Sequence, residues 1–314
     1  MVRRILTARN HPQGSLDMPA APLKRGKTSL GPRPSWLRVT TPTHGRVAEL
    51  DEIVQREHLH TVCESAACPN RGECWMRGTA TFMILGNVCT RSCGFCNVLA
   101  GRPTKLDLDE PRRVAQAVRS MGLKFAVVTS VNRDELADGG ASVWAETIRR
   151  IRVLNPGCGV EVLIPDFKGN NAAQDVVFRE RPDVLNHNVE TAPRLYLPVR
   201  PQANFQQSLE LLQRAKDAGL TTKSGMMLGI GETDEEVIDV MRALRAHGCD
   251  ILTLGQYLQP TPKHLQVDRY VTPAQFDAFK CEALALGFKK VDSGPLVRSS
   301  YHAEEVQTLG PVAS

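Results

Sequence analysis

The stretch that decides the fold reads ATFMILGNVCTRSCGFC, from residue 80 to residue 96, where an apolar run leads directly into three cysteines. Further short apolar runs follow along the chain, and an amphipathic stretch succeeds each of them. The predicted strands are 80–86, 125–130, 160–165, 184–190, 222–228 and 251–256, and the predicted helices are 110–121, 142–155, 171–180, 204–218, 234–247 and 273–286. Apolar strands that alternate with helices are typical of a parallel sheet covered on both faces. The sequence therefore predicts an α/β fold, either an open doubly wound sheet or an incomplete barrel.

Polar side chains gather where these predicted strands end, and in both arrangements ligands bind at the carboxyl ends of the strands. Cys89 follows the first strand. Ser130 and Asn132 follow the second strand, and Asn188 and Glu190 lie at the end of the fourth. We predict that these four polar residues contact a bound cofactor. A local network among loop side chains is the alternative.

Composition and charge exclude several classes of protein. No apolar run among the 314 residues approaches the roughly 18 residues that span a bilayer. The net charge of +5 arises in residues 1–48, which hold nine basic residues and one acidic residue, while the remainder is slightly acidic. The body of the protein therefore has no basic stripe suited to nucleic acid, and we expect neither a nucleic-acid nor a membrane partner.

The basic N-terminal residues allow two interpretations. A mitochondrial transit peptide is typically basic and poor in acidic residues, but it is also rich in Ser and amphipathic. Here Ser is scarce and Pro interrupts any amphipathic helix. We therefore expect a flexible arm on a bacterial, cytoplasmic protein rather than the leader of a mitochondrial matrix protein.

Cysteine usage is the main indication of function. The chain has nine cysteines, and six of them lie between Cys63 and Cys96. A secreted disulfide scaffold is usually much shorter, whereas clustered cysteines in a reducing compartment favour metal binding. The remaining Cys158, Cys249 and Cys281 are isolated in the sequence, and we expect them to be buried and inert.

The motif Cys89-x3-Cys93-x2-Cys96 indicates an iron–sulfur cluster. Three thiolates can hold three irons of a 4Fe–4S cluster and leave the fourth iron free to bind a chelating substrate. A zinc site is the alternative, but structural zinc sites usually pair two CxxC-like halves and close all four positions. The spacing therefore favours iron and sulfide over zinc.

A second triplet, Cys63-x4-Cys68-x5-Cys74, precedes the first motif. Its spacing is too loose for an ordinary zinc ribbon. Three thiolates again leave one iron of a 4Fe–4S cluster without a cysteine ligand. By itself, this triplet is compatible with a purely structural site.

Together, the two triplets resemble those of the lipoyl synthase family, within the radical S-adenosylmethionine superfamily. Phe95, directly before the last cysteine, also fits that superfamily. The resemblance extends over about residues 33 to 305 through PSWLRV at 34–39, GECW at 72–75, VVTSVNRDELADGG at 127–140, HNVET at 187–191, KSGMMLGIGET at 223–233, LTLGQYLQPT at 252–261 and RSSY at 298–301. Glu135 departs from the family pattern, where Asp is common at that position.

The resemblance implies an incomplete (β/α)6 barrel, similar to a TIM barrel, over residues 80–290. Residues 1–35 would be the flexible basic arm, and residues 36–79 an extension that binds an auxiliary cluster. Residues 291–314 would form a C-terminal segment that closes the barrel.

The resemblance also implies two 4Fe–4S clusters and S-adenosylmethionine as cofactors. The cluster on Cys89, Cys93 and Cys96 would cleave S-adenosylmethionine and start radical chemistry. An auxiliary cluster would be held by Cys63, Cys68, Cys74 and Ser300. Ser300 would supply a labile oxygen ligand, so that this cluster can be dismantled to donate sulfur.

The implied activity is that of a sulfurtransferase, which inserts sulfur at carbons 6 and 8 of an octanoyl group attached to a protein lysine. The implied partners are octanoylated lipoyl carrier domains, namely 2-oxoacid dehydrogenase E2 subunits and the glycine cleavage H protein, and an electron donor such as ferredoxin or flavodoxin. Three alternatives stay open: another radical enzyme of sulfur insertion, similar to biotin synthase or the methylthiotransferases; a non-catalytic iron–sulfur binding module; and a zinc-stabilised structural protein.

Two further charged residues, Arg194 and Lys223, are candidates for positioning a substrate or a carboxylate. Surface salt bridges explain them equally well.

Overall fold

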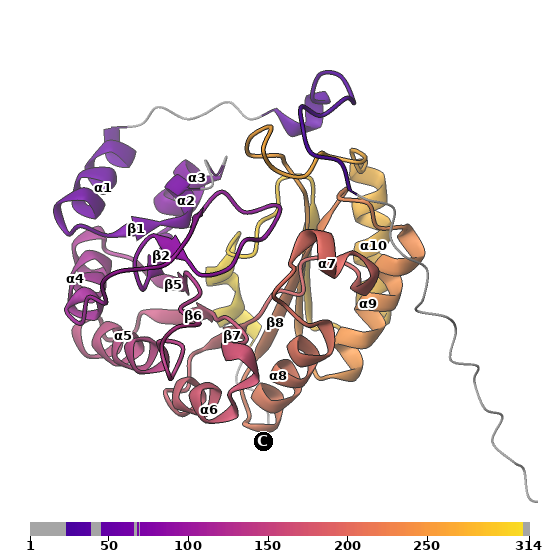
Figure 1. Cartoon of the computed structure of the whole chain (residues 1–314). Coiled ribbons are helices and arrows are strands. Elements are labelled where there is room, and N and C mark those ends of the chain that lie inside the picture. The colour runs from indigo at the N-terminus through magenta and orange to yellow at the C-terminus, as the bar shows by residue number, and fades with distance from the viewer. Residues whose placement is uncertain (1–22, 39–44, 66–67, 69, 310–314) are drawn as a thin grey trace, which may run out of the picture.

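The computed structural model describes residues 23–38, 45–65, 68 and 70–309. Its main sheet has the strand order β1-β2-β5-β6-β7-β8-β9-β10. Every neighbouring pair is parallel except β1 and β2. The strands are β1 (His60–Thr61), β2 (Thr79–Ile84), β5 (Phe125–Ser130), β6 (Gly159–Leu163), β7 (Val184–Asn186), β8 (Thr222–Leu228), β9 (Ile251–Gln256) and β10 (Lys290–Gly294). The sheet curves as in a barrel (Figure 1). Because β1 and β10 stand at opposite edges of the order of described strands, this barrel is not closed.

The helices lie on the outer side of the curved sheet (Figure 1). Each of the six predicted helices is present: α4 (Glu110–Met121), α5 (Ala141–Leu154), α6 (Asn171–Arg179), α8 (Phe205–Asp217), α9 (Asp234–Ala246) and α10 (Pro273–Ala285). Local sequence fixes their ends, as at α9, where Thr233 and Glu236 form a capping box. At the end of α4, Gly122 adopts the left-handed conformation with a φ of 63°. The six predicted strands and helices are therefore confirmed, with ends that differ by a few residues.

Two parts of the fold differ from the sequence prediction. The fourth strand ends at Asn186 rather than at residue 190, so Asn188 and Glu190 lie in the loop that follows it. The sequence predicts one helix in the N-terminal extension, around residues 47–57, which corresponds to α1 (Gly45–Arg56); two short helices, α2 (Val62–Ser65) and α3 (Arg71–Met76), follow it. Each short helix is one or two turns long and carries a cysteine, so neither has the apolar periodicity by which longer helices are predicted.

The C-terminal segment packs against the inner side of the barrel. It begins with β10, a seventh parallel strand that the sequence did not predict, because only Val291 of its five residues is buried. The chain then passes through the short helix η4 (Ala303–Leu309). Ala303 and Val306 pack against Phe125, Val127 and Val184 on the inner side of β5 and β7. These contacts fill the barrel from the amino ends of the strands.

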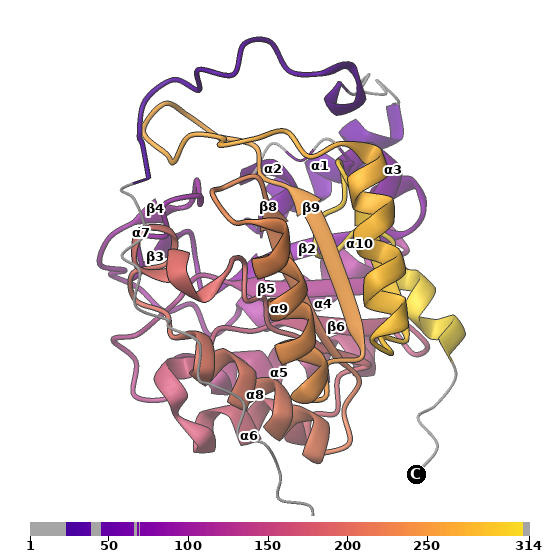
Figure 2. The ribbon, with the colours of Figure 1, turned by 90° about the vertical axis from the view of Figure 1, so that its right-hand side faces the viewer.

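Residues 23–35, which belong to the predicted flexible arm, form defined contacts with the body of the protein. Residues 1–22 of the predicted flexible arm lie outside the described residues. From Leu23 onward the chain runs beside the loop that follows β9, as the indigo and orange segments show in Figures 1 and 2. Arg25 forms a β-bridge with Leu265, and Thr28 Oγ1 donates a hydrogen bond of 2.8 Å to Gln259. This loop also contacts the cysteine loop, because Leu265 N donates to the Gly94 carbonyl at 3.0 Å.

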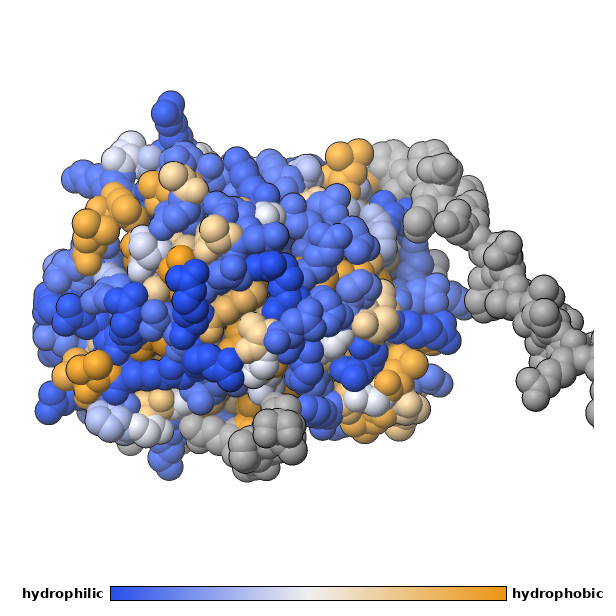
Figure 3. All heavy atoms as spheres, turned by 90° about the horizontal axis from the view of Figure 1, so that it is seen from below, coloured by the Kyte–Doolittle hydropathy of each residue, from blue (hydrophilic) through white to orange (hydrophobic). Residues whose placement is uncertain are grey.

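The face of the molecule at the bottom of Figure 1 is covered mainly by hydrophilic residues, with apolar ones in small separate groups (Figure 3). Within the described ranges, no helix has both the length and the apolar character needed to cross a bilayer.

Candidate active site

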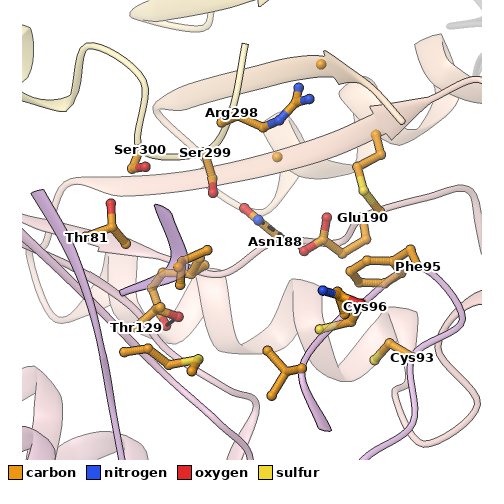
Figure 4. Close-up of a pocket in the computed structure, with 18 of the residues that line it drawn as sticks. Thr81, Cys93, Phe95, Cys96, Thr129, Asn188, Glu190, Arg298, Ser299 and Ser300 are labelled. Atoms are coloured by element: carbon orange, nitrogen blue, oxygen red, sulfur yellow. Dashed lines mark hydrogen bonds between the residues drawn. The ribbon is translucent and has the colours of Figure 1, made fainter. Parts of the chain in front are cut away.

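A cavity of about 530 Å³ opens at the carboxyl ends of the strands. Both cysteine triplets contribute to its wall, through Cys63 and Cys68 on one side and through Cys89, Cys93 and Cys96 on the other. Figure 4 shows Cys93, Cys96 and Phe95 at one side of the cavity and the segment Arg298–Ser300 at the opposite side, with Asn188 and Glu190 between them. Two cysteine groups that are separate in the sequence therefore face one cavity.

The loop with Cys89, Cys93 and Cys96 follows β2 and contains two short paired strands, β3 (Val88–Cys89) and β4 (Leu99–Ala100). Gly94 allows this loop to pack closely, because a Cβ there would lie 2.8 Å from Leu265 Cδ1. Burial raises the pKa of Cys93 to about 12, although the nearby charge of Arg200 opposes the shift. Burial also raises the pKa of Cys96, and the charges of neighbouring cysteines add to the rise at both residues. The three thiols are therefore close enough to interact, and a bound metal would displace their protons.

The other triplet is equally compact. Cys63 lies in α2, Cys74 lies in α3, and Cys68 is in the turn between them, where its N–H donates to the Cys63 carbonyl at 2.9 Å. Burial and, to a lesser extent, the charge of Cys68 raise the pKa of Cys63 to about 11. The pKa of Cys74 is raised by burial and then by Cys68 and Cys63. Cys74 does not line the cavity, but it is close to Cys63 and Cys68, which do.

Ser300 lies on the wall of the same cavity as Cys63 and Cys68. Its segment is held to α3 by polar contacts. Glu73 of α3 accepts a hydrogen bond of 3.2 Å from Tyr301 Oη and lies 3.2 Å from His302 Nε2. Thr79 Oγ1 donates to Glu304 at 2.8 Å. These contacts fix the serine segment beside the helix that carries Cys74.

The four predicted cofactor-contact residues all line the cavity. Asn188 Nδ2 donates to Glu190 at 3.1 Å, as the alternative of a local network requires, but Asn188 Oδ1 is buried and has no hydrogen-bond partner among the described residues. Ser130 Oγ is also buried and unpaired within the described structure. Asn132 is directed differently, because its side-chain amide lies 3.7 Å from Cys89 Sγ. Buried polar atoms without partners usually mark a place for a ligand or water, so Ser130 and Asn188 fit a bound polar cofactor.

The sequence reasoning missed Arg200. This residue follows the short helix α7 (Tyr196–Val199) and lines the cavity near Cys93. Its Nη1 donates to the Asn188 carbonyl at 2.8 Å, and its guanidinium lies 5.4 Å from the centre of the Tyr196 ring. Its Nε is buried without a hydrogen-bond partner in the part of the chain that the structure describes. No local sequence motif identifies Arg200 as a site residue, because it comes close to the cysteine loop only in the folded chain.

Lys223 and Arg194 have structural partners. Lys223 is buried and its Nζ lies 3.0 Å from Glu161 Oε2 inside the barrel, so it forms a core ion pair rather than a surface salt bridge. Arg194 forms the expected salt bridge, with Glu236 at 2.7 Å. Burial lowers the pKa of His187 to about 4, which keeps this residue neutral near pH 7.

The isolated cysteines follow the prediction in part. Cys249 is buried, but Cys158 is half-buried, and Cys281 is exposed on α10. The prediction was therefore wrong for Cys281, because the sequence around it does not show which side of the helix faces the sheet.

The described part of the chain contains no group of three His, Cys, Asp or Glu side chains arranged around a single metal ion. The thiolates of a 4Fe–4S cluster need not meet that arrangement, because each binds a different iron. Six cysteines on one cavity wall or next to it fit such clusters in number and in chemistry.

Comparison with known proteins decides the family. The radical SAM superfamily profile matches residues 83–244. A lipoyl synthase from Rubrobacter xylanophilus is 61% identical over 275 residues, which cover 87% of this chain and 86% of the relative. A second, from Chlorobaculum parvum, is 54% identical over 286 residues and covers 90% and 98% of the two chains. The chain belongs to the lipoyl synthase family. Its activity is that of a radical S-adenosylmethionine sulfurtransferase, and its cofactors include S-adenosylmethionine and a 4Fe–4S cluster.

Solved structures with a similar fold are more distant in sequence. Methylornithine synthase has a TM-score of 0.51 at 14% identity, with 78% of this chain and 81% of that chain covered. The FeFe-hydrogenase maturase from Carboxydothermus hydrogenoformans has a TM-score of 0.54 at 16% identity, with 83% and 77% covered. At these identities the comparison establishes the partial-barrel fold alone.

Proposed function

We propose that the chain divides its chemistry between two clusters that face one cavity: one starts the radical reaction, and the other supplies sulfur to octanoyl-lysine. The observation that carries this proposal is the shared wall of the cavity, to which Cys63 and Cys68 contribute together with Cys89, Cys93 and Cys96. An octanoyl chain that enters the cavity would meet both groups without leaving the protein.

The first half of the reaction rests on Cys89, Cys93 and Cys96 as ligands of a 4Fe–4S cluster. When bound, this cluster supplies the electron that cleaves S-adenosylmethionine. The polar groups around the cavity would orient that molecule: Arg200 offers an unpaired, positively charged donor to a carboxylate, and Glu190 accepts hydrogen bonds from amino or hydroxyl groups. Burial raises the pKa of Glu190, and the Arg200 charge opposes this rise. A cationic ligand at Glu190 would likewise favour its ionised form.

The second half rests on Cys63, Cys68, Cys74 and Ser300 as ligands of an auxiliary 4Fe–4S cluster, which is consumed as the sulfur donor. The support is the compact triplet, the position of Ser300 on the same wall, and the electrostatic interaction of Arg298 with Cys68. A positive charge beside the thiolates would offset part of their mutual repulsion. A serine oxygen would be the most easily lost of the four ligands.

The cavity also suits the chain that is modified. Its wall includes the apolar side chains of Met83, Val127, Leu163 and Val297, which would contact the octanoyl chain. The protein acts on lipoyl carrier proteins. We propose 2-oxoacid dehydrogenase E2 subunits and the glycine cleavage H protein as those carriers, and a ferredoxin or flavodoxin as the electron donor. The free cysteines favour a reducing compartment such as the bacterial cytoplasm.

Two single substitutions test the division of labour. In the anaerobically reconstituted protein, Cys93→Ala should abolish formation of 5′-deoxyadenosine from S-adenosylmethionine. Cys68→Ala should leave that cleavage measurable but stop the appearance of sulfur in an octanoylated carrier peptide, followed by mass spectrometry. Equal loss of cleavage in both variants, with the fold retained, would show that the two triplets do not have separate roles.

A further inference from the structure

The sulfur of Cys89 is surrounded by N–H donors. Arg91 N lies 3.4 Å from Cys89 Sγ, and Asn132 N lies 3.3 Å from it. The side-chain amide Nδ2 of Asn132 adds a third donor at 3.7 Å. Two of the three donors thus come from one residue that is 43 positions away in the sequence. Sulfur is a weak acceptor, but a thiolate bound to iron carries negative charge that such donors stabilise.

Backbone contacts hold the two loops in this arrangement. Thr90 N donates to the Asn132 carbonyl at 3.1 Å, and Thr90 Oγ1 approaches the same oxygen at 3.1 Å. The Asp134 N–H lies 3.1 Å from Thr90 Oγ1. Thr90 of the cysteine loop is therefore joined to the loop after β5 at Asn132 and at Asp134.

A buried arginine adds a second connection. The Arg91 guanidinium forms two bonds with Asp134, at 2.8 and 3.0 Å, and two with Asp166, at 3.0 and 2.6 Å. Arg91 is 6% exposed and Asp166 is 1% exposed. Paired bonds of this kind fix orientation as well as distance. Arg91 therefore joins the cysteine loop to the loops that follow β5 and β6, and its own N–H is held toward Cys89.

We propose that Asn132 and Arg91 are positioning residues that raise the reduction potential of the cluster held by Cys89, Cys93 and Cys96. Asn132 acts through its two N–H groups, and Arg91 acts by fixing the loops that present them. Reduction adds negative charge to the cluster, so N–H donors to its sulfurs stabilise the reduced state. A higher potential makes the cluster easier to reduce by a weak electron donor. This inference rests on the proposed ligand set of that cluster.

The test is a redox titration of the reconstituted full-length protein, followed by electron paramagnetic resonance without S-adenosylmethionine. The signal that changes when S-adenosylmethionine is added identifies the relevant cluster. In Asn132→Ala, the ratio of reduced to oxidised cluster at the wild-type midpoint should fall about threefold, which is about 28 mV at 59 mV per tenfold for one electron. Arg91→Lys keeps the positive charge but loses the paired hydrogen bonds of the guanidinium. It should lower the midpoint potential, as Asn132→Ala does.

The matched control is Arg133→Lys. Arg133 is a buried arginine of the same loop, paired with Glu135 at 2.6 Å and bonded to the Leu85 carbonyl at 2.9 Å. The midpoint potential of the cluster in Arg133→Lys should equal that of the wild type. A cluster-loaded Asn132→Ala with an unchanged or higher midpoint would overturn the inference, and Asn132→Ala decides the matter if Arg91→Lys does not fold. A wild-type protein without any signal that responds to S-adenosylmethionine would instead overturn the proposed cluster site itself.

Discussion

Gly255 is the position where a single methyl group should separate the two halves of the reaction. It lies in β9, is buried, and lines the cavity. A Cβ at this position would lie 2.1 Å from the Val297 carbonyl oxygen and 3.1 Å from its carbon. The close approach means that the C-terminal segment crosses directly over β9 just before Ser300.

The size of the effect follows from this geometry. Non-bonded carbon atoms prefer separations of roughly 3.5–4.0 Å, so Gly255→Ala must displace the Val297 backbone by about 1 Å. Overpacking of this kind costs about 1–3 kcal/mol of stability, which the folded protein can tolerate. A shift of about 1 Å in a reacting group can cost about a hundredfold in rate. We therefore expect lipoyl formation to fall about a hundredfold while S-adenosylmethionine cleavage continues.

The assay measures both products in one reaction, 5′-deoxyadenosine by chromatography and the sulfur-containing carrier peptide by mass spectrometry. Gly294→Ala is the control, because Gly294 pairs with Gly255 across β9 and β10. A Cβ on Gly294 would meet Val297 Cγ2 at 3.4 Å, an ordinary contact, so both products should form as in the wild type. Normal lipoyl formation in Gly255→Ala, or a parallel loss of both products, would refute this reasoning.

Three further changes probe the cavity and its supports. Arg200→Gln should weaken binding of S-adenosylmethionine about 10- to 100-fold in equilibrium dialysis, because a hydrogen bond to a charged group is worth about 1.5–3 kcal/mol; unchanged affinity would remove Arg200 from the site. Lys223→Met should lower the free energy of unfolding by about 3–5 kcal/mol in urea, because it removes the buried cation that is paired with Glu161 in the barrel; a variant as stable as the wild type would show that this ion pair does not stabilise the fold. Burial alone would raise the pKa of Glu304, but its hydrogen-bond donors hold it below the ordinary 4.5. Glu304→Gln should therefore destabilise the protein by its full amount above about pH 4.5, and this difference from the wild type should disappear as the pH falls through the lower pKa of the folded state. Urea unfolding of the metal-free protein at a series of pH values measures the difference.

The cysteine triplets could be recognised in the sequence because the cysteines of each triplet lie within one short loop or helix pair, so that spacing along the chain reflects spacing in the fold. The six strands could also be predicted from the sequence, since burial on both faces makes them continuously apolar. Strand β10 was missed because it lies at the edge of the sheet and four of its five residues are only half-buried.

Contacts between distant segments were not accessible in this way. Lys223 pairs with Glu161 across β7, at a separation of 62 residues, and nothing in the string that begins at Lys223 identifies Glu161 as its partner. Asn132 lines the cavity, but its direction toward Cys89 depends on how two loops meet, which the sequence does not show. Arg200 follows a helix of only four residues, and its unpaired Nε has meaning only beside the cavity. Sequence periodicity reports which residues are buried, not which of them face each other.

The origin of the inserted sulfur tests the central claim most directly. The protein would be reconstituted with heavy-isotope sulfide, freed of excess sulfide, and given one round of reaction with an octanoylated carrier peptide in a buffer that contains only light sulfide. If the cluster on Cys63, Cys68 and Cys74 is the donor, the lipoyl group will carry heavy sulfur at both positions. Light sulfur in the product, with the iron and sulfide of both clusters intact after turnover, would contradict the account.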